Sequence, residues 1–125
     1  MSPRVKLNKA LEAALEDPFA VLVDPPTSAA RFPGRVVVCV QRAGITPSPV
    51  MAGWANALAV YLLVPHEAYA AAEEALDEHL PTLVAAIEAE GLPIVSMDRD
   101  VFFDQGESPG WHGYRVLTTA HTTNP

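Results

Sequence analysis

The sequence predicts a single α+β domain, with a mixed, mainly antiparallel sheet of about four or five strands covered by an N-terminal helix and one long helix. Three observations support this prediction. The chain has 125 residues, half of them hydrophobic, which suits one packed core and leaves little room for a second domain. Two segments repeat apolar residues at helical spacing. The segments between and after them have the composition of strands.

Residues 3–17 are the first predicted helix. Apolar residues including Leu7, Leu11 and Leu15 recur at four-residue steps and would form one buried stripe. Ser2 is suited to accept backbone N–H groups as the N-cap. Proline 18 follows directly, and we expect the helix to end there.

Residues 19–23 form a short apolar run, which we interpret as a brief edge strand. Residues 36–41 are the clearest strand, because they begin with consecutive β-branched valines. The single cysteine, Cys39, lies inside this run. A thiol in such a place acts as a small hydrophobe, so we do not expect it to be a reactive nucleophile.

Residues 43–53 are predicted to form a projecting loop. Glycines interrupt this segment, and Pro47 and Pro49 lack the backbone N–H group that helices and strand ladders use. Residues 54–64 return to an apolar run in which both alternating sets of side chains are hydrophobic. That pattern predicts a central strand covered on both faces.

Residues 66–90 carry the longest helical pattern. Pro81 lies inside it and would remove one backbone hydrogen bond, so we expect two collinear helical pieces. Residues 94–103 alternate and predict a strand with one face in water. Turn-forming residues 104–110 then lead to a last strand, residues 111–122, so we expect an antiparallel hairpin.

The charges exclude some functions and are unevenly distributed. The chain has 8 basic and 15 acidic residues and a formal net charge of −7, which disfavours specific nucleic-acid binding. Residues 1–65 carry six basic and four acidic side chains, whereas residues 66–125 carry two basic and eleven acidic ones. Separate positive and negative regions would suit a head-to-tail contact between copies, with solvated surface as the equal alternative. The candidate interface residues are Arg35, Arg42, Glu73 and Asp77.

The sequence contains no motif typical of a catalytic, metal-binding or phosphate-binding site. The four histidines have no metal-ligand spacing, and the glycines form no phosphate-binding loop. No nucleophile, base and orienting acid occur in a local signature. We therefore expect no catalytic, cofactor-binding or metal-binding residues and no enzymatic activity. No apolar run is long enough for a membrane span, so we expect no membrane partner.

The order of elements resembles the tail terminator family of long-tailed (siphovirus-type) bacteriophages. The resemblance covers nearly the whole chain and depends on the order of the helices and strands. Its carriers are the N-terminal helix ending at Asp17-Pro18, the strands 35–40 and 56–65, the helix 67–90 and the hairpin at 111–115. It implies a structural virion protein without cofactors, assembled in the host cytoplasm and located at the head–tail interface.

The resemblance also implies partners. Family members form a ring, usually a hexamer, that binds the end of the tail tube, stops polymerisation of the major tail tube protein and docks the head–tail connector or head completion protein. Genome DNA would pass through the lumen without specific contacts. Loops carried on a rigid sheet are the natural contact candidates. Those in this sequence are Ile45, Thr46, Pro47, Ser48 and Pro49 in the first loop, and Gln105 and Glu107 in the turn before the last strand.

Two alternatives remain open at the level of sequence. A head–tail joining or tail-completion protein of the virion neck would bind the connector without stopping tube growth. A ferredoxin-like binding module would instead hold a small ligand at a sheet edge. Assembly assays separate the first alternative, and a ligand-dependent rise in melting temperature would identify the second.

Overall fold

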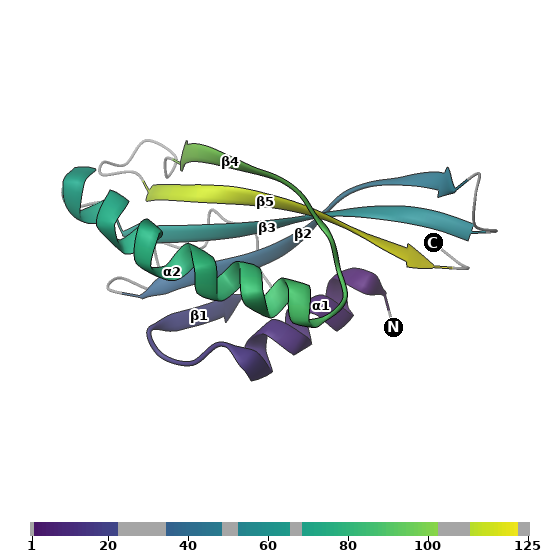
Figure 1. The fold of residues 1–125 in the computed structure, drawn as a ribbon, viewed down its shortest axis with the longest axis horizontal. Coiled ribbons are helices and arrows are strands. Elements are labelled where there is room, and N and C mark those ends of the chain that lie inside the picture. The colour runs from purple at the N-terminus through teal and green to yellow at the C-terminus, as the bar shows by residue number, and fades with distance from the viewer. Residues whose placement is uncertain (1, 23–34, 49–52, 66–68, 103–110, 123–125) are drawn as a thin grey trace.

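The computed structural model describes residues 2–22, 35–48, 53–65, 69–102 and 111–122, and it confirms the predicted α+β class (Figure 1). Within these residues two helices accompany a five-stranded, mostly antiparallel sheet. The elements in chain order are α1 (Pro3–Ala14), β1 (Phe19–Leu22), β2 (Val36–Ser48), β3 (Gly53–Pro65), α2 (Tyr69–Ala89), β4 (Ile94–Phe102) and β5 (Trp111–Thr122).

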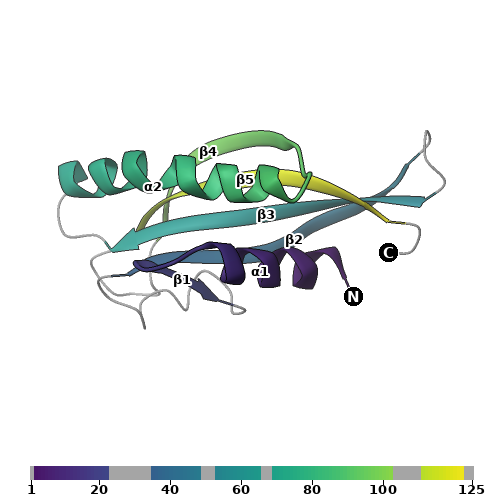
Figure 2. The same ribbon diagram turned by 60° about the horizontal axis from the view of Figure 1, so that its bottom comes forward.

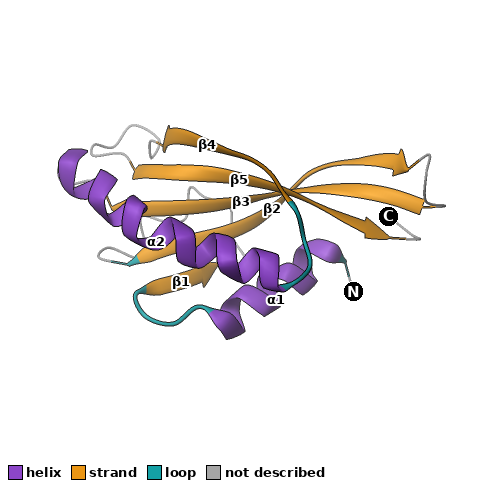
Figure 3. Cartoon of the chain, viewed as in Figure 1, coloured by secondary structure: helices purple, strands orange, loops and turns teal. Residues whose placement is uncertain are grey.

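The strand order in the sheet is β1-β2-β3-β5-β4 (Figure 3). β1 pairs parallel with β2, as a short edge strand, and the other neighbours pair antiparallel. β3 is central, as its two apolar faces predicted, and β4 and β5 form the expected hairpin. The hairpin's predicted turn, residues 104–110, lies outside the described residues.

The first helix begins as predicted and ends earlier. The Ser2 hydroxyl accepts a hydrogen bond from the Val5 amide at 3.3 Å, which is the expected N-cap. The helix stops at Ala14, where Leu15 leaves helical geometry and donates its N–H to the Leu11 carbonyl at 2.8 Å. Proline 18 therefore lies in the connection to β1 and is not the residue at which the helix ends.

The prediction of two helical pieces around Pro81 is wrong, because α2 is one continuous helix. Pro81 lies on the exposed side of α2, while Leu76 and Leu83 on either side of it are fully buried. Packing of the buried side against the sheet holds both halves in line. The hydrogen bond lost at the proline is therefore tolerated in the middle of the helix.

Both helices contribute to one core on one face of the sheet. α1 packs against β1 and β2, and α2 packs against β3, β5 and β4; the helices also contact each other (Figure 2). The core combines Leu7, Leu11 and Leu15 of α1 with Leu76, Leu83 and Ile87 of α2 and with Val38, Val60, Leu62 and Val116 of the sheet. A smaller cluster on the opposite face contains Cys39, buried as expected, with Leu22, Val37 and Leu63.

The predicted loop at residues 43–53 is largely strand, which corrects the sequence prediction. β2 continues to Ser48, β3 begins at Gly53, and the two pair throughout, with one irregularity between Arg42 and Gly44. Pro47 pairs with Trp54 on the outermost strand of this part of the sheet, where a missing N–H group can be accommodated. Residues 49–52, including the candidate Pro49, lie outside the described residues.

The continuing strands form a projection that we call the arm, made of residues 42–48, 53–57 and 119–122. β5 follows β3 to its end, with Thr122 opposite Trp54. The sheet thus narrows to three strands that extend past the ends of both helices (Figure 1). Four of the predicted contact residues, Ile45, Thr46, Pro47 and Ser48, lie in this arm as strand residues.

Candidate interaction surfaces

A buried side chain links two strands of the arm to each other. Asn56 lies at the base of the arm and is buried, with 1% of its surface exposed. Its Nδ2 donates to the Ala120 carbonyl at 3.1 Å and to the Thr122 hydroxyl at 3.0 Å. These bonds add a side-chain link to the β3–β5 ladder. The arm therefore continues the hydrogen-bonded ladders of the sheet and can carry contact residues beyond the core.

The arm offers its own side chains to solvent. Arg42, Gly44, Thr46 and Pro47 are exposed, in contrast to the fully covered valines earlier in β2. Ile45 and Trp54 are partly buried, so the arm also holds some apolar surface. Such a mixture of exposed polar and partly exposed apolar groups on a rigid support suits contact with another protein.

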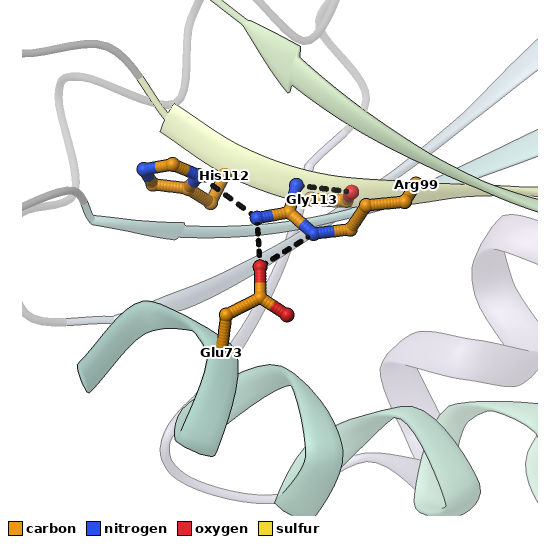
Figure 4. Close-up of polar contacts among 4 residues, drawn as sticks. All are labelled: Glu73, Arg99, His112 and Gly113. Atoms are coloured by element: carbon orange, nitrogen blue, oxygen red, sulfur yellow. Dashed lines mark hydrogen bonds and ion pairs between the residues drawn. The ribbon is translucent and has the colours of Figure 1, made fainter. Parts of the chain in front are cut away.

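An ion pair that the sequence analysis missed connects α2 to the β4–β5 hairpin (Figure 4). Arg99 of β4 donates through Nε to Glu73 Oε1 of α2 at 2.8 Å, and its Nη2 contacts the same oxygen. Its Nη1 donates to the Gly113 carbonyl at 3.1 Å. The guanidinium also lies 5.9 Å from the centre of the Tyr114 ring, within the range of a cation–π contact.

His112 completes this cluster. Arg99 Nη2 lies 2.8 Å from His112 Nδ1, and because a guanidinium only donates, Nδ1 acts as the acceptor and carries no proton. His112 is 6% exposed, and Glu73 and Arg99 are both partly buried. A helix residue and two strand residues meet here from positions 26 and 13 residues apart. No local spacing signals such a meeting; only the scarcity of arginines among the many acids of this half hints at it.

The four predicted interface residues have different environments. Arg35 binds Asp17 at 2.9 Å and donates to the Phe19 carbonyl at 3.0 Å, so it fastens the start of β2 to β1. Glu73 is engaged by Arg99. Arg42 and Asp77 are both exposed, on the arm and on α2 respectively. The structure therefore brings two of the four into contacts within the chain and leaves Arg42 and Asp77 at the surface. The candidates Gln105 and Glu107 lie outside the described residues.

β4 is the apolar edge of the sheet. Val95 is 57% exposed and Met97 is 47% exposed, and these are the exposed large hydrophobic residues of the described chain. Val95 lies at an irregularity between Ile94 and Ser96 in the pairing with β5. Asp98 is exposed on the same strand. The wet face predicted for this strand is therefore partly apolar, and soluble proteins usually protect such edges.

The two helices differ in the charge that they expose. The second helix and the residue after it expose only acids among their charged side chains. These acids are Glu74, Asp77, Glu78, Glu88 and Glu90. The first helix exposes Lys6, Lys9 and Glu12, so its exposed charges are of both signs. The exposed charges of α2, over the β3–β5–β4 side of the sheet, are therefore all acidic, whereas those of α1, over the β1–β2 side, are mixed.

A pocket of about 230 Å³ lies where the start of α1, the end of α2 and the end of β5 meet. Its lining includes Lys6, Glu90 and His121 beside the apolar Leu7 and Leu92. Among the described residues, no group of three or more potential ligands could hold a metal ion. In that same part of the chain, neither helix has the length and hydropathy of a bilayer-spanning segment.

Comparisons with family models and with curated proteins identify no relative of the chain. No family model matches the chain, and no curated protein matches it. The surfaces described above are therefore the basis on which a function is argued.

Proposed function

We propose that this protein is a tail terminator of a long-tailed bacteriophage. In this proposal, copies of the chain form a ring at the head-proximal end of the tail tube, stop tube polymerisation and provide the docking surface for the head–tail connector. The arm is the observation that carries the proposal. It is an exposed, strand-paired extension of a small packed domain, and it suits the task of covering a polymer end by contact alone.

The distribution of charge supports assembly into a ring. A head-to-tail contact needs two different surfaces on each copy that match each other. The exposed acids of α2 and the exposed basic residues Lys9 and Arg42 lie on different parts of the molecule, with opposite sign. This complementarity favours one relative orientation of neighbouring copies and disfavours contact between like surfaces.

The negative net charge also suits the proposed location. A channel that DNA traverses must not hold the phosphate backbone, and a protein of net charge −7 repels it. The genome would then pass the ring without specific contacts.

Assembly of tail tubes in the presence of the purified chain tests the proposal. Tube protein is polymerised alone and with the chain, and tube lengths and ends are measured by negative-stain electron microscopy. We expect shorter tubes with a ring at one end and a loss of further growth when fresh tube protein is added. Tubes that keep growing while the chain joins heads to tails would instead identify a joining protein.

An arm variant and a matched control sharpen this test. Replacing the exposed Thr46 by Asp places a charge on the arm, whereas Thr82→Asp makes the same change on the exposed side of α2. We expect the first variant to remain folded and to lose capping by at least tenfold, and the second to cap normally. Equal capping by both variants would contradict the role assigned to the arm.

The pocket near His121 supports a second candidate, a small-ligand binding module. Its volume of about 230 Å³ is below the usual range for drug-sized ligands, and its charged groups carry opposite signs. A screen of small metabolites by thermal shift tests it. A reproducible rise in melting temperature, lost in the His121→Ala variant, would favour this candidate over the tail terminator.

A further inference from the structure

The contact between α2 and the β4–β5 hairpin contains a buried histidine. His112 of β5 lies opposite Val64 of β3 in the strand register, and both side chains are buried. Arg99 of β4 approaches His112 Nδ1 with its Nη2 at 2.8 Å, and the same guanidinium binds Glu73 of α2 (Figure 4). The imidazole ring therefore lies where two strands and a helix meet.

The protonation state of His112 decides the net charge of this cluster. Nδ1 accepts a hydrogen bond from Arg99, so it carries no proton, and the charges of Arg99 and Glu73 cancel. A protonated ring would lose that acceptor, would touch the guanidinium as a second cation, and would raise the net charge of the cluster to +1. Burial makes an unbalanced charge costly. The packed arrangement therefore favours the neutral ring.

Among the described residues, one carboxylate serves this cluster. Glu73 is already engaged by Arg99, so a protonated His112 would compete with Arg99 for it. Asp98 of β4 pairs with Arg115 in the register and, by alternation, lies on the opposite face of the sheet from Arg99. The other charged or titratable groups on these parts of α2 and β5 are the exposed Glu74 and Asp77 of α2 and the partly buried Tyr114 and Arg115 of β5.

We propose that His112 makes the attachment of the β4–β5 hairpin to α2 dependent on pH. With a neutral ring, Arg99 is held at the same time by Glu73, His112 and the Gly113 carbonyl, and the hairpin stays against the helix. When Nδ1 takes a proton from solvent, the contact with Arg99 is lost and the hairpin separates from α2 more readily. This inference goes beyond the tail terminator function and does not depend on it.

The direction of the pH dependence follows from the protons that each state binds. In the unfolded chain the ring of His112 is in water and takes its proton at about pH 6.5, whereas the packed cluster opposes protonation. The unfolded chain thus binds more protons in acid, so the stability that the cluster contributes is present above about pH 6.5 and is lost as the pH falls. Complete exclusion of the proton from the folded state would raise the unfolding equilibrium constant about tenfold between about pH 7.5 and about pH 5.5.

The first experiment compares the wild type with His112→Asn, which keeps an acceptor near the position of Nδ1 and does not titrate. Urea denaturation at about pH 7.5 and about pH 5.5 gives the unfolding constant of each, and the titration of all other groups cancels in the comparison. We expect this constant to rise about threefold to tenfold more in the wild type than in His112→Asn. His121→Asn changes an exposed histidine of the same strand and should keep the pH dependence of the wild type. Equal pH dependence of the wild type and His112→Asn would overturn the proposal.

The second experiment needs no variant and locates the effect. Nuclear magnetic resonance of the histidine ring nitrogens follows the protonation of His112 and His121 in the wild type, and hydrogen exchange, corrected for intrinsic rates, follows the backbone amides. We expect His112 to gain its proton at lower pH than His121. Over the same range, amides of β4 should lose at least threefold more protection than those paired between β2 and β3. Loss of β4 protection no greater than that of the β2–β3 pair would overturn the proposal, whatever the state of the ring.

Discussion

The two halves of β2 show how this small domain divides its tasks. From Val36 to Val40 every residue is buried, between helices on one face and a second apolar cluster on the other. From Arg42 to Pro47 the same strand is mostly exposed and forms the arm. The first half buries apolar side chains and therefore stabilises the fold, while the second half provides exposed surface for contacts. A function that depends on contact can thus change in the arm with little cost to the fold.

The largest difference between these regions should appear on removal of apolar side chains. Leu62 is completely buried in the main core, so Leu62→Ala should lower the free energy of unfolding by about 2–5 kcal/mol. Ile45 is only partly buried on the arm, and Ile45→Ala should cost less than about 1 kcal/mol because less area is lost. Urea denaturation measures both. Equal losses would mean that the arm is part of the cooperative core.

The sequence was sufficient to predict the packed half. Helix spacing, the Ser2 cap and the consecutive valines of β2 are local signals, and the structure confirms the elements that they predicted. The arm was missed because Pro47 is a signal against strands, whereas its position on an outermost strand removes the conflict. The two helical pieces predicted from Pro81 were wrong for a similar reason. The stability gained by burying one side of α2 outweighs the loss of one backbone hydrogen bond at the proline.

Most features of the candidate surfaces could not be predicted from the sequence, because local residue patterns do not show which distant residues meet. Arg99, Glu73 and His112 meet only after α2 packs against the hairpin, so their ion pair and hydrogen bond have no sequence signature. Exposure of Val95 and Met97 follows from the strand order, because alternation along β4 does not reveal that it lies at an edge. Segregated charge, in contrast, was readable from residue counts alone.

Two glycines, one in the packed part of the sheet and one on the arm, should respond differently to substitution by alanine, with a smaller change in stability than the leucine substitution. A Cβ atom added at Gly113 would lie 2.3 Å from the Leu62 carbonyl oxygen and 2.6 Å from Leu63 Cδ2, so β5 would have to move from β3. We expect Gly113→Ala to destabilise the chain by about 1–3 kcal/mol. At Gly44 on the arm nothing lies within 4 Å of the added atom. Gly44→Ala should therefore be neutral or stabilise by up to about 1 kcal/mol.

Thermal and urea unfolding of both glycine variants provide the measurement. Native-state hydrogen exchange adds a local readout, because displacement of β5 would raise exchange along the β3–β5 ladder. A Gly113→Ala variant as stable as the wild type would mean that the close packing of these strands relaxes without cost.

The ion pair tests whether the hairpin is fixed to α2 by charge as well as by packing. Glu73→Gln keeps the shape of the side chain and removes the negative charge beside partly buried Arg99. We expect a loss of about 1–2 kcal/mol, since Arg99 keeps only its neutral acceptors. Asp77→Asn on the exposed side of the same helix is the matched control and should change stability by less than about 0.5 kcal/mol. Similar small effects of both would show that packing alone positions the hairpin.

The smallest effect is expected at the surface pair of Arg35 and Asp17. The Asp17 side chain is 87% exposed and that of Arg35 is 44% exposed, so water and salt screen their attraction. Asp17→Asn should therefore change the free energy of unfolding by less than about 0.5 kcal/mol. Arg35 also donates to the Pro18 and Phe19 carbonyls, so Arg35→Met should cost more than Asp17→Asn, through loss of these bonds between β1 and β2. Self-association measured on the same two variants decides whether Arg35 acts between copies as well. If Arg35→Met weakens association while Asp17→Asn leaves it unchanged, Arg35 contacts a neighbouring copy, and the separation of a packed half from a contacting half no longer holds.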